Sequence, residues 1–154
     1  VYVTPAFSVL GAPWWQSDVR GAVVGLTFAT TRAHFLRAAL ESIAFQVKDL
    51  VDAMTNATGT PLREIAADGG PTKNSLLMQL QADLLRSPIV CTEVEDASAF
   101  GAAIVCGLAT GMWHNFDEVK PLRKVTQVTE PGADSHDALY NGWRKAVENL
   151  IKQK

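Results

Sequence analysis

One stretch constrains the fold of this chain more than any other: Ile65-Ala-Ala-Asp-Gly-Gly-Pro-Thr-Lys-Asn74. The apolar run 65–67 predicts a short strand inside a sheet that is covered on both faces. Gly69 and Gly70 end the strand, because glycine adopts backbone conformations that other residues avoid. Pro71 suits the first position of a helix, and the apolar residues after it have helical spacing. The stretch therefore predicts a strand–turn–helix unit.

Such a turn has two interpretations. It can direct free N–H groups and the positive end of a helix dipole at one point, which suits a phosphate group. It can also be a tight turn between a strand and a helix with no ligand, because short glycine motifs often match by chance. The turn alone leaves both open.

Length, composition and charge narrow the classes of protein. The 154 residues fit one domain with a full hydrophobic core, and 47% hydrophobic with 19% charged residues indicate a folded chain. A formal net charge of −2 gives no electrostatic case for nucleic acid or an anionic membrane surface. No apolar run is long enough to span a bilayer. The chain opens at Val1 in a strand-like run without Met, so we expect a piece of a longer protein.

The cysteines and histidines predict neither a disulfide framework nor a His/Cys metal site. Cys91 in a predicted strand and Cys106 in a predicted helix are expected to be reduced core residues, which suggests the cytoplasm. His34, His114 and His136 are scattered and lack ligand spacing with the cysteines.

Hydrophobic spacing predicts alternating strands and helices, which favours an α/β domain with helices packed on a sheet. Strands are predicted at 1–7, 21–27, 62–67, 89–92 and 125–129. Helices are predicted from Thr30 or Thr31 to a stop at Asn56 and Gly59, and at 74–85, 97–109 and 135–151. The helix at 97–109 is rich in Ala and Gly, which indicates close packing on the sheet or close approach to a nucleotide base.

The spacing also predicts which helix residues face the core. In the first helix they are Phe35, Leu36, Ala39, Leu40, Ile43, Val47, Leu50, Val51 and Met54, opposite His34, Arg37, Glu41, Lys48 and Asp52. Phe45 interrupts that polar side. In the later helices the inward residues are Leu76, Leu77, Leu80 and Leu84, then Leu139, Trp143, Val147 and Leu150.

The loop 8–20 carries Trp14 and Trp15. These rings either form a contact surface for a substrate, a domain or a subunit, or the loop folds back and buries its own aromatics.

Two segments separated by seven residues, Gly21-Ala-Val-Val-Gly-Leu26 and His34-Phe-Leu-Arg-Ala-Ala-Leu-Glu41, resemble the second signature of the FGGY carbohydrate kinases. These are the glycerol, xylulose, gluconate and ribulose kinases. Segments 5–14, 68–83 and 100–111 also resemble the family, and the resemblance weakens after about Asp117.

The resemblance implies an actin-like ATPase (ribonuclease H-like) fold with a mixed sheet and helices packed on it. Residues 1–154 correspond to the C-terminal nucleotide-binding domain of a two-domain kinase, and the N-terminal sugar-binding domain lies outside this chain. The implied reaction transfers the γ-phosphate of ATP, with Mg²⁺, to a hydroxyl of a sugar or polyol. Pro71-Thr-Lys73 departs from glycerol kinases and favours a xylulose-kinase-like member slightly.

Matched by position, Gly69, Gly70 and Asn74 are implied to bind the nucleotide. Gly70 has no side chain to press on a ligand, Asn74 can donate and accept hydrogen bonds, and Gly69 shapes the turn. Asp68 is expected to be a turn or capping residue, with an indirect role near Mg²⁺ as the alternative. Lys73 is expected to be solvated.

The family's catalytic aspartate and phosphate-binding loop would precede Val1, so no catalytic residue and no metal ligand is predicted here. Asp18 is the nearest substitute, but nothing in the sequence places it within hydrogen-bond reach of a substrate. We expect the isolated chain to be inactive. A homodimer is one expectation for the assembly. The alternative function is a non-catalytic interaction module with a structural glycine turn, in which Trp14, Trp15 and Phe45 serve a protein interface.

Overall fold

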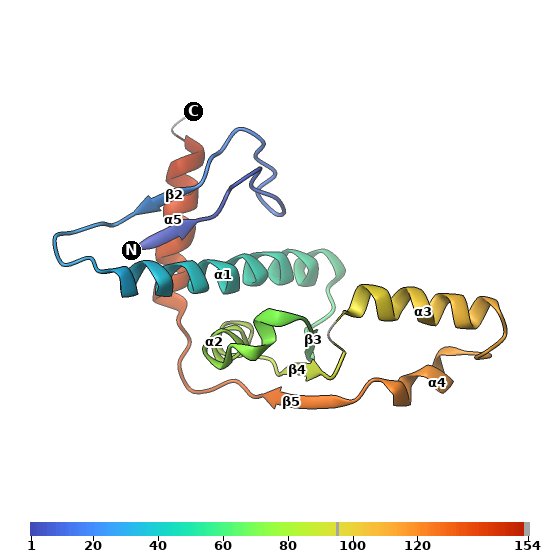
Figure 1. Cartoon of the computed structure of the whole chain (residues 1–154). Coiled ribbons are helices and arrows are strands. Elements are labelled where there is room, and N and C mark those ends of the chain that lie inside the picture. Colours follow the sequence, from blue (N-terminus) through green and yellow to red (C-terminus); the bar gives the residue numbers. More distant parts are fainter. Residues whose placement is uncertain (95, 153–154) are drawn as a thin grey trace.

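The computed structural model describes residues 1–94 and 96–152 (Figure 1). Its strands are β1 (Tyr2–Thr4), β2 (Ala22–Val24), β3 (Ile65–Ala67), β4 (Ile89–Thr92) and β5 (Val125–Thr129). Its helices are α1 (Arg32–Thr58), α2 (Ser75–Leu85), α3 (Ala97–Ala109), α4 (Phe116–Val119) and α5 (Asp137–Lys152), with short 3-10 turns η1 (Gly70–Lys73) and η2 (Lys120–Leu122). The predicted α/β class is confirmed, and the first three strands are shorter than predicted.

The described strands form two sheets. β1 and β2 pair antiparallel, with Val3 opposite Val23. In the second sheet β4 is central, parallel to β3 and antiparallel to β5, so that Val90 lies opposite Ala66 on one side and Val128 on the other. The predicted mixed sheet is therefore confirmed, but β3 is an edge strand. Ala66 of β3 is exposed, so the expected burial of this strand on both faces is wrong.

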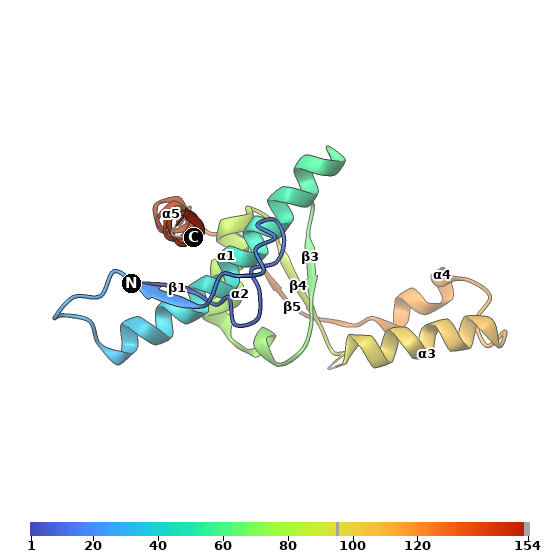
Figure 2. The ribbon, with the colours of Figure 1, turned by 90° about the horizontal axis from the view of Figure 1, so that it is seen from above.

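The core joins the two sheets through α1, α2 and α5 (Figures 1 and 2). The ring of Phe45 in α1 lies 5.9 Å from that of Tyr140 and 5.6 Å from that of Trp143, both in α5. The indole Nε1 of Trp143 donates a hydrogen bond of 2.8 Å to the carbonyl of Val3, which ties α5 to β1. The C-terminal helix is thus part of the main core.

The ends of α1 agree with the sequence, but its buried face does not. Thr31 is the N-cap, and Gly59 ends the helix with a left-handed φ of 65°. The residues buried in α1 are Ala38, Glu41, Ser42, Ala44, Phe45 and Asp49. The predicted inward residues Phe35, Leu36, Ala39, Ile43, Leu50 and Met54 are exposed instead. The periodicity of the sequence separates two faces of α1. The contacts of Asp49 and Phe45 with residues elsewhere in the chain decide which of these faces is buried.

The two rings of the loop 8–20, which we call the tryptophan loop, differ in burial. Trp14 is half-buried, its Nε1 donates to Asp49 Oδ2 at 2.7 Å, and the Arg144 guanidinium lies 5.4 Å above its ring. Trp15 is 77% exposed, so the prediction that the loop buries its own aromatics is confirmed for Trp14 and wrong for Trp15.

Helix α3 projects away from the sheets, accompanied by α4 (Figures 1 and 2). Of its 13 residues, all described, Gly107 alone is buried, so the expected close packing on the sheet is wrong. Cys106 is exposed, against its predicted core position, whereas Cys91 is buried as predicted. Leu76 and Leu139, also predicted to face the core, are exposed.

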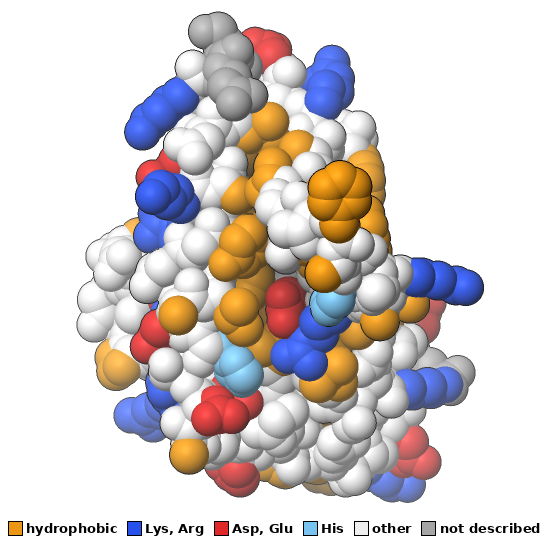
Figure 3. Space-filling model, turned by 90° about the vertical axis from the view of Figure 1, so that its left-hand side faces the viewer, with side chains coloured by type: hydrophobic (Ala, Val, Ile, Leu, Met, Phe, Trp, Pro, Cys, Tyr) orange, Lys and Arg blue, Asp and Glu red, His pale blue; other side chains and the backbone are white. Residues whose placement is uncertain are grey.

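Figure 3 shows the side of the molecule that carries α5 and the β1–β2 sheet, with apolar side chains along a groove. A cavity of about 370 Å³ lies there, lined in part by Tyr2, Val24 and Leu150. Within the described residues, no helix is both long and apolar enough to cross a membrane.

Candidate functional site

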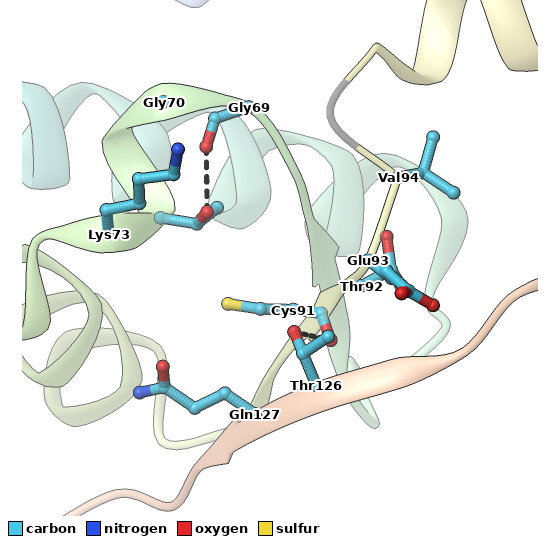
Figure 4. A pocket seen from close by; sticks show the side chains of 10 residues that line it. Gly69, Gly70, Lys73, Cys91, Thr92, Glu93, Val94, Thr126 and Gln127 are labelled. Carbon is cyan, nitrogen blue, oxygen red and sulfur yellow. Dashed lines mark hydrogen bonds between the residues drawn. The ribbon is translucent and has the colours of Figure 1, made fainter.

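The parallel strands β3 and β4 have their carboxyl ends on the same side of the sheet. Ala67 and Thr92 are their last residues. Ligands of α/β proteins bind outside the carboxyl ends of parallel strands. A cavity of about 520 Å³ opens at these carboxyl ends (Figure 4). It is lined by Gly69, Gly70, Thr72, Lys73, Cys91, Thr92, Glu93, Val94, Thr126 and Gln127.

The glycine turn shapes one wall of the cavity. Gly69 has a φ of 82°, a left-handed value that glycine adopts at no steric cost. The Thr72 hydroxyl donates to the Gly69 carbonyl at 2.7 Å, shown by a dashed line in Figure 4. Pro71 lies at the start of η1, a 3-10 turn, rather than at the start of the α-helix as predicted. This turn holds the chain close to the cavity before α2 begins at Ser75.

Gly70 leaves open space in front of the turn. A Cβ built at Gly70 would meet no described heavy atom within 4 Å. Packing within the described chain therefore does not require glycine at this position. The open space is what a bound group would need, and any side chain at this position would enter it.

Asn74 has a structural role that its prediction as a ligand contact did not include. Its Oδ1 accepts a hydrogen bond of 3.1 Å from the Leu77 N–H, which makes it the N-cap of α2. Among the described residues its side-chain NH₂ group has no hydrogen-bond partner. Asn74 can therefore cap the helix and still donate to a ligand.

Asp68 is a capping residue, as predicted, but of a different helix. Its Oδ2 accepts from the Ala97 N–H at 3.1 Å, and Asp96 Oδ1 accepts from the Ala99 N–H at 2.9 Å. Two carboxylates thus occupy the N-terminus of α3. They would repel a phosphate, so the α2 end of the site is the better place for an anion.

Lys73 is exposed, as expected, and Figure 4 shows it with Cys91 and Gln127 around the open space between the turn and the strands. Cys91 lies in the cavity wall, and its sulfur is 3.9 Å from that of Met78. Burial raises the pKa of the Cys91 thiol, so the thiol stays protonated and is a poor nucleophile.

Sequence reasoning missed the residues that β5 contributes. The Thr126 hydroxyl donates to the Cys91 carbonyl at 3.3 Å, and Gln127 lies beside it in the cavity wall. They come from a strand more than 50 positions after the glycine turn, and no local motif marks them. The antiparallel pairing of β5 with β4 brings them to the site.

One other candidate, Asp18, lies apart from the cavity, and no metal-binding group is found among the described residues. Asp18, in the tryptophan loop, accepts a hydrogen bond of 2.9 Å from Ser17 and does not line the cavity. No group of three or more His, Cys, Asp or Glu residues in the described part of the chain is placed to hold a metal ion.

Comparison with known proteins adds independent information. Residues 1–110 match the FGGY family of carbohydrate kinases, C-terminal domain. A glycerol kinase of Bacillus licheniformis is 46% identical over 149 residues, which cover 96% of this chain and 30% of the relative. The chain thus spans about 30% of the length of the curated relatives it matches.

Solved structures of carbohydrate kinases share the fold of this chain. The crystal structure of Plasmodium falciparum glycerol kinase with ADP has a TM-score of 0.83 and 38% identity, over 97% of this chain and 30% of that one. The structure of xylulose kinase from Rhodospirillum rubrum has a TM-score of 0.77 and 26% identity, over 98% of this chain and 30% of that one. The predicted actin-like ATPase fold is confirmed.

Proposed function

Because the chain belongs to the FGGY family of carbohydrate kinases, we propose that it is the nucleotide-binding part of an ATP-dependent polyol kinase. The observation that carries the proposal is the open space at Gly70, at the carboxyl ends of two parallel strands and next to the N-terminus of α2. Gly69 and Gly70 line the cavity, whereas Asn74 is the N-cap of α2 and is not among the lining residues, so its contact with a nucleotide stays a prediction.

The polyol that the sequence favours is glycerol. Bacterial glycerol kinases are 45–47% identical to this chain and that of Plasmodium falciparum is 38% identical, whereas the xylulose kinase of Rhodospirillum rubrum is 26% identical. This outweighs the departure at Pro71-Thr-Lys73, which pointed slightly to xylulose. The substrate pocket itself belongs to the part of the kinase outside this chain.

Mg²⁺ would neutralise phosphate charge during phosphoryl transfer. The described residues offer no cluster of ligands for it, and Asp68 is bonded to the N-terminus of α3. We therefore propose that the ion arrives with the nucleotide and that residues outside this chain hold it. A cytoplasmic location and a homodimer stay predictions.

Nucleotide binding can be tested on the chain itself by its melting temperature in increasing Mg-ATP. A ligand that binds only the folded state stabilises it by about 2.7 kcal/mol at 100 times Kd. We expect the melting temperature to rise, and the rise to vanish in Gly70→Val, whose side chain fills the open space. Gly11→Val is the matched control, because Gly11 also has no described atom near its Cβ position but lies in the tryptophan loop.

An unchanged melting temperature up to millimolar Mg-ATP would contradict nucleotide binding. It would favour the non-catalytic interaction module, whose surface would include the exposed Trp15.

The kinase role can be tested in a chimera. Residues 1–154 replace the matching segment of the Bacillus licheniformis glycerol kinase, and glycerol-dependent ADP release is measured. We expect activity in the chimera and none in the isolated chain, for which no catalytic base is predicted. A folded but inactive chimera would contradict the proposed role, as would turnover by the isolated chain.

A further inference from the structure

One residue, Thr72, holds the carbonyl of Gly69 through two hydrogen bonds. The Thr72 N–H donates to this carbonyl at 3.1 Å, and the Thr72 hydroxyl donates to it at 2.7 Å (Figure 4). The backbone bond closes the turn 69–72 and would form with any residue except proline at position 72. The hydroxyl bond depends on the side chain, so it is a feature that this sequence adds to the turn.

The local sequence does little else to fix the peptide between Gly69 and Gly70. Gly69 has a φ of 82° and a ψ of 179°, a conformation that is almost restricted to glycine. Because the next residue is glycine too, no Cβ on either side resists rotation of this peptide. Pro71 disfavours a helical conformation for the residue before it, yet Gly70 is the first residue of η1. The Thr72 hydroxyl therefore favours one orientation of a peptide that could otherwise turn over.

This orientation decides where the Gly70 N–H points. The peptide is trans, and in a trans peptide the C=O and the N–H point in opposite directions. With the Gly69 carbonyl turned to Thr72, the Gly70 N–H faces away from Thr72. In the described part of the chain no acceptor is found for this N–H, and Gly70 lies in the cavity wall with open space before it. A peptide that turned over would present a carbonyl there, which can only accept hydrogen bonds.

We propose that Thr72 is a positioning residue for nucleotide binding, because its hydroxyl holds the Gly69–Gly70 peptide with the Gly70 N–H available to donate to the nucleotide. The inference rests on the proposed function and adds to it a residue that acts through another. The hydroxyl has one hydrogen to donate, and that hydrogen is used on Gly69. The role of Thr72 is therefore to set the turn before the ligand arrives, which reduces the ordering that binding must cost.

Thr72→Val tests the proposal, because valine keeps the branched shape and removes the hydroxyl. The full chain is titrated with Mg-ATP by isothermal titration calorimetry. From the net contribution of one neutral hydrogen bond, we expect the Kd for Mg-ATP to rise about three- to tenfold. Thr72→Ser, which keeps the hydroxyl, should restore the affinity of the unsubstituted chain.

A second measurement, made without nucleotide, reports the peptide itself. The nuclear Overhauser effect between the Gly69 Hα atoms and the Gly70 amide proton is strong at the observed ψ of 179° and weakens when the peptide turns over. We expect a strong effect in the unsubstituted chain and in Thr72→Ser, and a weaker one in Thr72→Val. A loss of stability alone would change neither readout while the chain stays folded.

Thr110→Val is the matched control. The Thr110 hydroxyl also donates to a backbone carbonyl, that of Cys106 at 2.9 Å, but Thr110 ends α3 and does not line the cavity. This substitution should leave the Kd for Mg-ATP and the Gly69–Gly70 Overhauser effect unchanged.

The outcomes separate this inference from the proposed function. If the unsubstituted chain did not bind Mg-ATP, both would be overturned. If the unsubstituted chain bound Mg-ATP and Thr72→Val bound it equally well, the positioning role alone would be overturned. The same holds if Thr72→Ser bound as weakly as Thr72→Val, or if the Overhauser effect were equally strong in Thr72→Val and in the unsubstituted chain.

Discussion

Tyr140 and Asp49, 91 positions apart in sequence, form a buried hydrogen bond in which the phenol Oη donates to Oδ1 at 2.5 Å. Asp49 also accepts from Trp14 Nε1 at 2.7 Å, and the Arg144 Nε lies 3.8 Å from Oδ1. One carboxylate therefore joins α1, α5 and the tryptophan loop. Burial, followed by the hydrogen bond to Asp49, raises the pKa of Tyr140, so this phenol remains a donor well above neutral pH.

Removing the phenol hydroxyl should destabilise the fold. Tyr140→Phe keeps the ring beside Phe45 but leaves a buried carboxylate with one donor fewer, which costs about 1–3 kcal/mol. We expect a lower urea midpoint with an unchanged slope, followed by circular dichroism. Tyr2→Phe is the control, because the Tyr2 hydroxyl has no hydrogen-bond partner among the described residues. Equal midpoints for the two variants would contradict the role of this bond.

Asp83 should make the stability depend on acid pH. It accepts hydrogen bonds from the Gly132 N–H at 2.6 Å and from Gln79 Nε2 at 2.8 Å, and His136 Nε2 lies 3.3 Å away. Burial acts to raise the pKa of Asp83, but these hydrogen bonds and His136 lower it below the ordinary 3.8. Because the unfolded state then binds the proton more readily, this stabilisation is present above the unfolded pKa and is lost as pH falls through the folded one.

The measurement is urea unfolding from pH 7 down to the acid limit of solubility. Asp83→Asn should be less stable than the unsubstituted chain at neutral pH, and the difference should shrink on acidification. Asp134→Asn, an exposed carboxylate, is the control and should show no such convergence. A difference for Asp83→Asn that stays constant across the pH range would contradict the assignment.

The two functions of Asn74 can be separated by two substitutions. Asn74→Asp keeps a side-chain oxygen for the Leu77 N–H but removes the NH₂ donor and adds a negative charge. It should retain stability and lose Mg-ATP binding. Asn74→Ala should lose both, at a cost of about 1 kcal/mol for the missing cap. The readouts are the urea midpoint and the nucleotide-dependent rise in melting temperature. Unimpaired Mg-ATP binding by Asn74→Asp would remove Asn74 from the site.

Local patterns predicted the elements well, because caps, turns and periodicity are properties of neighbouring residues. Strands β4 and β5 and helix α3 have the predicted bounds, and Gly59 ends α1 as expected. Which face of α1 is buried could not be predicted, because it depends on Tyr140 and Trp14 far along the chain. Most of the α1 residues predicted to face the core are exposed instead.

The candidate site likewise contains residues that were predicted from the sequence and residues that were missed. Gly69 and Gly70 were identified from the sequence because a strand that breaks at two glycines is a local signal, and the structure places both at a cavity. Thr126 and Gln127 were missed because they reach that cavity through the pairing of β5 with β4. The capping of α3 by Asp68 also joins residues 29 positions apart, so its partner could not be predicted.

Two glycines of α3 provide the sharpest test of how this projecting helix is held. A Cβ at Gly107 would collide with the Trp113 ring, whereas a Cβ at Gly101 would meet no described atom within 4 Å. Gly101→Ala should stabilise the helix by up to about 1 kcal/mol through helix propensity alone. Gly107→Ala gains the same propensity but must displace Trp113, so we expect less helix and a red-shifted tryptophan emission. The substitutions are compared by urea unfolding and by fluorescence. If both raised the urea midpoint equally, the Gly107–Trp113 contact would not be what holds α3 to the segment that follows it.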